Sequence, residues 1–157
     1  MDNETILQTA RLLAEDIAES IDTIAPNRMD IHLHRADDLM PIVAGLRVKR
    51  LGYLAAIVGL DPGGEQDNLE VLYFFCPGAA IITLRLLVPK SEAQVPTLSE
   101  IIPSAEPFER ELSEMFGIKV VGLRNPAHLY LPDDWEEGVY PLRKGVEVQA
   151  LIAQSLS

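Results

Sequence analysis

Three apolar runs occupy residues 53–88 of this 157-residue chain: YLAAIVGL (53–60), LEVLYFFC (69–76) and AAIITLRLLV (79–88). Their β-branched and aromatic side chains favour strands. The strings DPGG at 61–64 and PG at 77–78 separate the runs, which predicts two hairpin connections. Because the runs are almost continuously apolar, we expect a helix to cover one face of the resulting sheet and a partner to cover the other.

The segment before this stretch predicts a helix, a strand and a second helix. Apolar side chains recur at steps of three and four through residues 3–24, which predicts one amphipathic helix, capped by Asp2 or Asn3 and ended by Pro26. Residues 29–33 alternate apolar and polar side chains, as a half-buried strand does. The second helix is expected to follow that strand.

The segment after the stretch predicts two further helices. The string TLSE at 97–100 has the spacing of a capping box, in which the Glu100 side chain would bond the Thr97 amide at the start of a short helix. A longer helix is expected over residues 104–116, ended by Gly117 in a left-handed conformation.

The longer helix has one apolar face and one charged face. The apolar side chains are those of Phe108, Leu112, Met115 and Phe116. We expect Phe108, Leu112 and Met115 to form the buried face of this helix, and the side chains of Arg110, Glu111 and Glu114 to point outward or toward a partner.

Beyond Gly117 the pattern changes, because six glycines and prolines fall between Gly117 and Pro141 and no helical stripe can be drawn. This predicts an extended tail, in which three aromatic residues could anchor a partner: Tyr130, Trp135 and Tyr140. We therefore expect an α+β domain over residues 1–118, a two-layer fold with a mixed or antiparallel sheet packed by helices. An irregular C-terminal tail over residues 119–157 would continue from it.

Composition limits the classes of partner. The chain has 13 basic and 24 acidic residues and a net charge of −11, which argues against binding nucleic acid or an anionic membrane. No apolar run reaches the roughly 20 residues that a membrane-spanning helix needs. Asp2 and Glu4 stand where a signal peptide would carry positive charge. We expect a cytoplasmic protein that reaches a membrane only through its partners.

The sequence predicts no cofactor. Its single cysteine, Cys76, cannot supply the roughly four ligands that an iron–sulfur cluster requires. It has no Gly-x-Gly-x-x-Gly dinucleotide loop, no Walker loop and no Cys-x-x-Cys pair. We therefore expect neither a nucleotide, a flavin, a cluster nor a metal to be held by this chain alone.

Carboxylates cluster on the longer helix at Glu109, Glu111 and Glu114. Such a cluster can serve acid–base or metal chemistry, but no histidine accompanies it at ligand spacing, so a charged surface is the favoured interpretation. The alternative is a stand-alone carboxylate- or metal-dependent enzyme that uses Glu109, Glu111, Asp133 and His128. A deep pocket joining the helix to the tail would favour that alternative.

Two strings in the tail have the composition of contact sites. Asp133 and Asp134 are typical of a turn, and Trp135 next to them can either fill a gap in its own domain or anchor a partner. Arg143 and Lys144 form a cationic pair in an acidic chain, so they are a candidate docking point for a partner that carries a carboxylate.

Three strings occur in a fixed order: PFERELSEMFGI (107–118), LPDDW (131–135) and YPLRK (140–144). Together they resemble the signature of the 30-kDa (C chain) subunit family of respiratory complex I, which also occurs in membrane-bound nickel–iron hydrogenases. The resemblance assigns signature and interface positions to Glu109, Arg110, Glu111, Glu114, Asp133, Asp134, Trp135, Arg143 and Lys144. It carries over no catalytic residue.

The resemblance implies a cofactor-free structural subunit in the peripheral arm of an NADH:quinone oxidoreductase. Its partners would be the large catalytic subunit and the small subunit that bears iron–sulfur clusters, and these partners would perform the electron transfer. The same role in an energy-converting membrane-bound hydrogenase stays open. A free-standing interaction module, such as an assembly factor, is a third hypothesis.

Overall fold

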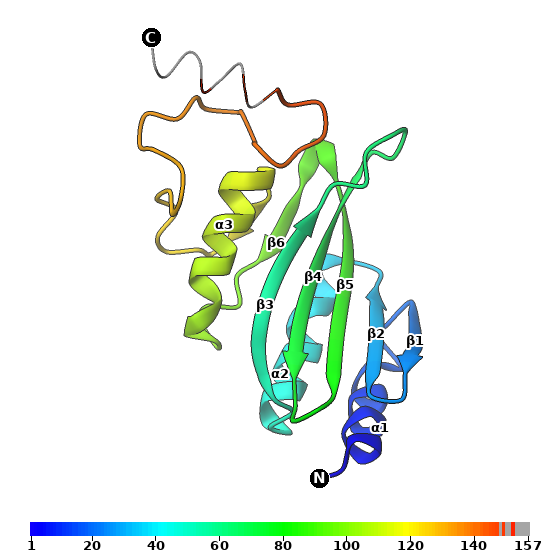
Figure 1. The fold of residues 1–157 in the computed structure, drawn as a ribbon. Helices are drawn as coiled ribbons and strands as arrows, with labels where there is room; N and C mark the ends of the chain where they lie inside the picture. The colour runs from blue at the N-terminus through cyan, green and yellow to red at the C-terminus, as the bar shows by residue number, and fades with distance from the viewer. Residues whose placement is uncertain (148, 150–151, 153–157) are drawn as a thin grey trace.

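A five-stranded sheet with the order β1-β2-β5-β4-β3 forms the centre of the molecule (Figure 1). The computed structural model describes residues 1–147 together with residues 149 and 152. The strands are β1 (Ser20–Ala25), β2 (Arg28–Leu33), β3 (Tyr53–Leu60), β4 (Asn68–Cys76) and β5 (Ile81–Pro89). Strands β2 and β5 run parallel and the other neighbours antiparallel, so the sheet is mixed. The predicted α+β fold is confirmed.

Strands β3, β4 and β5 form the meander that the three apolar runs predict. Alternate residues of β4 are buried, including Tyr73, which is 1% exposed and pairs with Ile57 of β3 and Leu84 of β5. These side chains therefore share one face of the sheet, as expected for a period of two.

The first helix is shorter than its apolar stripe predicts. Helix α1 spans Asn3–Ala14, and the Asp2 side chain caps it by accepting a hydrogen bond from the Thr5 amide at 2.8 Å. The prediction of a helix to residue 24 is wrong, because residues 20–25 form β1 instead. These residues are rich in β-branched side chains, and pairing with the edge of β2 gives their backbone groups antiparallel partners.

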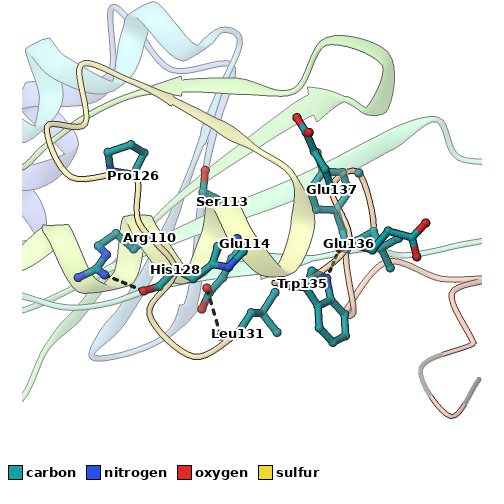
Figure 2. Close-up of a pocket in the computed structure, with 12 residues that line it drawn as sticks. Arg110, Ser113, Glu114, Pro126, His128, Leu131, Trp135, Glu136 and Glu137 are labelled. Atoms are coloured by element: carbon teal, nitrogen blue, oxygen red, sulfur yellow. Dashed lines mark hydrogen bonds between the residues drawn. The ribbon is translucent and has the colours of Figure 1, made fainter. Parts of the chain in front are cut away.

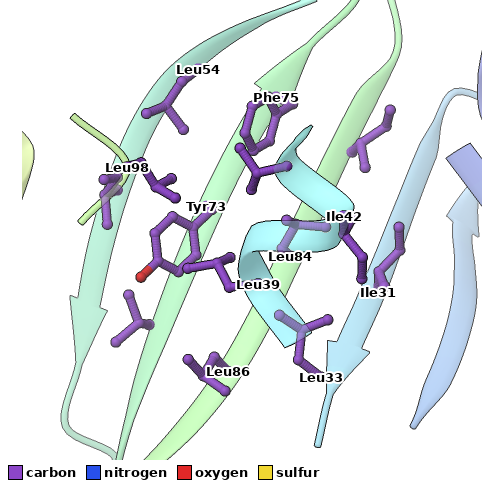
Figure 3. Close-up of a cluster of buried hydrophobic side chains, with 14 of the residues drawn as sticks. Ile31, Leu33, Leu39, Ile42, Leu54, Tyr73, Phe75, Leu84, Leu86 and Leu98 are labelled. Atoms are coloured by element: carbon purple, nitrogen blue, oxygen red, sulfur yellow. The ribbon is translucent and has the colours of Figure 1, made fainter. Parts of the chain in front are cut away.

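The helices pack on one face of the sheet. Helix α2 (Leu39–Val48) places Leu39 and Ile42, both fully buried, over β4 and β5, and Figure 3 shows them beside Tyr73 and Leu84. Helix α3 (Glu106–Phe116) runs along β3 on that same face, since Gly59 beneath it pairs with the buried Val71. A Cβ at Gly59 would come within 2.5 Å of the Phe116 ring, so glycine allows the helix to approach this closely.

Strands β6 (Gln94–Pro96) and β7 (Lys119–Val121) form a small parallel sheet. In the sequence, β6 precedes α3 and β7 follows it. Short 3₁₀ turns at Ala36–Asp38, Lys90–Glu92 and Pro103–Ala105 connect the elements. The predicted short helix at 97–100 is wrong: the Thr97 amide donates to the Val121 carbonyl at 2.8 Å and extends this small sheet. Residues 119–121, expected to begin the irregular tail, are strand β7.

Candidate functional site

The signature helix α3 directs two of its carboxylates inward. Glu109 is 1% exposed and Glu114 is 6% exposed, whereas Arg110 and Glu111 are half-buried. The expectation that Glu114 points outward or toward a partner is therefore wrong. Of the three side chains predicted to form the buried face, Leu112 is 2% exposed, whereas Phe108 and Met115 are half-buried against the core.

Glu109 joins α3 to the segment that follows β6. Its carboxylate accepts hydrogen bonds from the Thr97 hydroxyl at 2.6 Å and from the Leu98 amide at 2.5 Å. Burial raises the pKa of Glu109, and these two hydrogen bonds only partly oppose the rise. The capping box predicted that Glu100 would bond the backbone at Thr97. Glu109 instead accepts the hydrogen bonds at the start of this segment.

Glu114 and Arg110, one helical turn apart, hold the backbone of the tail. The Glu114 carboxylate accepts hydrogen bonds from the amides of Leu129 at 2.9 Å and Tyr130 at 2.8 Å. The Arg110 guanidinium donates to the carbonyls of Ala127 and His128, both at 2.9 Å; Figure 2 shows the bond to His128. One side chain thus binds amides and the other binds carbonyls, and both types of backbone group in this irregular segment find partners.

A pocket of about 340 Å³, open to solvent, lies between α3 and the tail. Figure 2 shows Trp135 and Leu131 on one side of it and Ser113 on the helix. The indole N–H of Trp135 donates to the Val139 carbonyl at 2.9 Å, which fixes the ring at the edge of the pocket. Residues of α3 and of the tail, held together by these hydrogen bonds, therefore form the pocket.

The tail is attached to the domain a second time at the C-terminal end of α3. Arg143 donates from Nε to the Phe116 carbonyl at 2.6 Å, and its guanidinium lies 4.9 Å from the centre of the Tyr140 ring. Gly117 ends the helix in the left-handed conformation at φ 68°, as predicted, and a Cβ there would collide with Tyr140. The YPLRK string thus packs against the helix that carries the first signature string.

A third attachment uses Asp61, which no sequence motif singles out as a contact. Its carboxylate accepts hydrogen bonds from the Lys144 amide and the Gly63 amide, both at 2.9 Å, and pairs with the Lys90 ammonium at 2.9 Å. Burial alone would raise the pKa of Asp61, but these contacts outweigh it and lower the pKa. The DPGG string predicts the local turn, but it does not predict the contact with Lys144, which lies 83 residues further along the chain.

The remaining signature side chains lie on the surface. Asp133, Asp134 and Lys144 are exposed, and Trp135 is half-buried. The four residues of the hypothetical enzyme do not converge: Glu109 faces Thr97, Glu111 lines a small pocket beside β3, and His128 lines the tail pocket. Among the described residues, no group of three or more His, Cys, Asp or Glu side chains could hold a metal ion. In the same part of the chain, no helix is both long and apolar enough to cross a bilayer.

Comparison with known families gives a match over residues 32–150 to the family described as respiratory-chain NADH dehydrogenase, 30 Kd subunit. The C subunit of NADH-quinone oxidoreductase from Roseiflexus castenholzii (strain DSM 13941 / HLO8) is 32% identical over 156 residues, which cover 96% of this chain and 87% of that protein. Membrane-bound hydrogenase subunit beta of Pyrococcus furiosus is 37% identical over 89 residues, which cover 55% of this chain and 51% of that protein.

A third relative, formate hydrogenlyase subunit 5 of Escherichia coli (strain K12), is 33% identical over 109 residues. The alignment covers 68% of this chain but only 19% of that protein, and about half of the Pyrococcus protein. The chain therefore matches only a part of some of its relatives.

Two solved structures have the same fold. A chain of the membrane-bound sulfane sulfur reductase, an archaeal respiratory membrane complex, superposes with a TM-score of 0.81 and 21% identity, covering 97% of this chain and 89% of that one. The trypsin-resistant fragment of Nqo5 superposes with a TM-score of 0.62 and 26% identity, covering 78% of this chain and 97% of that one.

Proposed function

Because this chain belongs to the respiratory-chain NADH dehydrogenase 30-kDa subunit family, we propose that it is a structural subunit of a complex I-like assembly and carries no cofactor of its own. It docks on the large catalytic subunit and on the small subunit that bears the iron–sulfur clusters. Electron transfer belongs to those partners, and this chain lies at the periphery of the membrane through them.

One observation carries this proposal: charged side chains of the signature strings bind backbone groups of the same chain and so hold the tail in place. Glu114, Arg110 and Arg143 bind backbone groups of the tail or of α3, and these contacts hold the tail segment around the half-buried Trp135. A loop that is ordered before binding loses less conformational entropy on association. Such an arrangement suits a docking surface better than a catalytic centre.

Co-purification tests the proposal. An affinity-tagged chain expressed with the other subunits of its assembly should retain the large and the small subunit. Trp135→Ala should weaken that assembly by about 2 kcal/mol, roughly thirtyfold in the dissociation constant, because an aromatic side chain that a partner covers is a typical hot spot.

Tyr53→Ala is the matched control. Tyr53 is an aromatic residue that is 65% exposed at the start of β3, whereas the tail attaches beyond the end of that strand. This variant should assemble like the wild type. Failure of the wild-type chain to retain either subunit would contradict the proposed function.

The same role in a membrane-bound hydrogenase is the second candidate, and the similarity to the Pyrococcus hydrogenase subunit favours it. The two candidates differ in the large subunit. Two paired Cys-x-x-Cys motifs that ligate nickel in the co-purifying large subunit would identify a hydrogenase, and their absence a quinone reductase or a related enzyme.

A further inference from the structure

A second hollow, of about 430 Å³, lies next to the tail pocket, and Tyr140 lines both. Its charged lining consists of Lys90, Lys119 and Arg143 against one carboxylate, that of Glu92. This excess of positive charge is unusual in a chain of net charge −11. The hollow is called the basic pocket below.

Arg143 is held in place before any partner arrives. Its Nε donates to the Phe116 carbonyl at 2.6 Å, and its Cζ lies 4.9 Å from the centre of the Tyr140 ring. No described residue accepts a hydrogen bond from its two terminal amino groups. A guanidinium with its stem fixed and these donors unused is suited to binding a carboxylate.

The two lysines contribute differently. Lys90 already pairs with the Asp61 carboxylate at 2.9 Å, so most of its charge is balanced. Lys119 is exposed at the start of β7, and no ion pair joins it to any residue in the described part of the chain. Arg143 and Lys119 are therefore the two cations that the pocket offers.

We propose that the basic pocket receives a single carboxylate side chain from a neighbouring subunit, with Arg143 and Lys119 as its cationic contacts. This inference rests on the proposed function and names the chemistry of one of its contacts. The overall negative charge of the chain repels an extended polyanion such as nucleic acid, whereas a single carboxylate needs only this local excess of positive charge. Glu92, which also lines this hollow, disfavours a partner segment that carries additional negative charge.

Zero-length cross-linking of the intact assembly tests the inference. A carbodiimide joins a lysine amine to a carboxylate only where the two groups are in contact, and mass spectrometry identifies the linked peptides. Lys119 should form an amide with an Asp or Glu of another subunit. Lys49, an exposed lysine at the end of α2, is the matched control and should not do so selectively.

Charge reversal provides an independent measurement. Lys119→Glu should weaken retention of the partner subunits by about tenfold, because two carboxylates would then face each other. Lys49→Glu should retain them as the wild type does, and Lys119→Arg should restore binding.

The outcomes separate the two proposals. If the wild-type chain retains no partner, the proposed function fails. If it retains them but Lys119 links only within its own chain, or Lys119→Glu binds like the wild type, the basic pocket is not a contact and this inference is overturned.

Discussion

At the scale of single residues, the carboxylates of α3 show why helical spacing is an incomplete guide. The sequence places Glu109 and Glu114 on a charged helix, and the amphipathic pattern assigns charge to the solvent side. Both are instead buried, because each accepts hydrogen bonds from backbone amides that would otherwise lack partners. The partners lie 11 to 17 residues away in the sequence, so no local pattern reveals them.

The raised pKa of Glu109 predicts a pH-dependent stability. A carboxyl group whose pKa is higher in the folded state binds more protons there, so the free energy of unfolding falls as the pH rises from the ordinary glutamate pKa, about 4.3, toward the raised one. In Glu109→Gln this fall should disappear. The glutamine carbonyl can accept from the Leu98 amide, and its amide can donate to the Thr97 hydroxyl.

Thermal or urea unfolding between pH 4 and 7 measures this difference. Glu109→Ala should instead lose about 1–3 kcal/mol, because it leaves the buried Leu98 amide unpaired. If the free energy of unfolding depended on pH in the same way in the wild type and in Glu109→Gln, the pH dependence would not come from Glu109.

At the scale of elements, α3 is the part that the sequence predicts best and α1 the part that it predicts worst. The position of α3, its Gly117 end and its buried Leu112 follow from local chemistry: a proline in the first turn, an apolar stripe and a glycine with φ above zero. The stripe of residues 3–24 fails because Ile21 and Ile24 satisfy helical spacing as well as they suit a strand. The nearby β2 edge decides for the strand.

The register of α3 predicts unequal costs for two neighbouring substitutions. Leu112→Ala should lower the free energy of unfolding by about 2–5 kcal/mol, because Leu112 packs against β3 in the core. Glu111→Gln should change it by less than about 1 kcal/mol, since its half-buried side chain has no hydrogen bond or ion pair within the described residues. Denaturant unfolding of both variants measures these losses. A larger loss for Glu111→Gln than for Leu112→Ala would contradict this register.

At the scale of the whole molecule, the tail is attached to the domain at three points: α3, the end of α3, and the β3–β4 connection. Composition predicts its irregular backbone and its aromatic residues. The attachment is decided by Asp61, Glu114 and Arg143, which are far apart in the sequence.

Hydrogen exchange on the isolated chain checks this attachment. The amides of Leu129, Tyr130 and Lys144 should exchange slowly, because buried carboxylates accept their hydrogen bonds, whereas the exposed residues 133–134 should exchange fast. Asp61→Asn should speed exchange at Lys144 about tenfold or more and leave Leu129 unchanged.

Asp67→Asn, in the same connection but with an exposed side chain, is the matched control and should leave Lys144 as it is in the wild type. The lowered pKa of Asp61 adds a second readout. Its stabilising contribution is present above the ordinary aspartate pKa, about 3.9, and is lost as the pH falls through the lowered one. Uniformly fast exchange across 127–144 in the wild type would show that the tail is not attached.

The sequence by itself determined the class of fold, the β3–β4–β5 meander, the extent of α3 and the three signature strings that place the chain in its family. These features depend on neighbours within a few residues: alternation, capping and turn chemistry. Only the tertiary structure decided that β1 is a strand, that Glu109 and Glu114 are buried, that Asp61 holds Lys144, and that Lys119 and Arg143 share one pocket. For Glu109, Glu114 and Asp61 the physical reason is the same: a buried carboxylate accepts hydrogen bonds from backbone amides that folding brings within about 3 Å, and these amides include partners 11 to 83 residues away in the sequence.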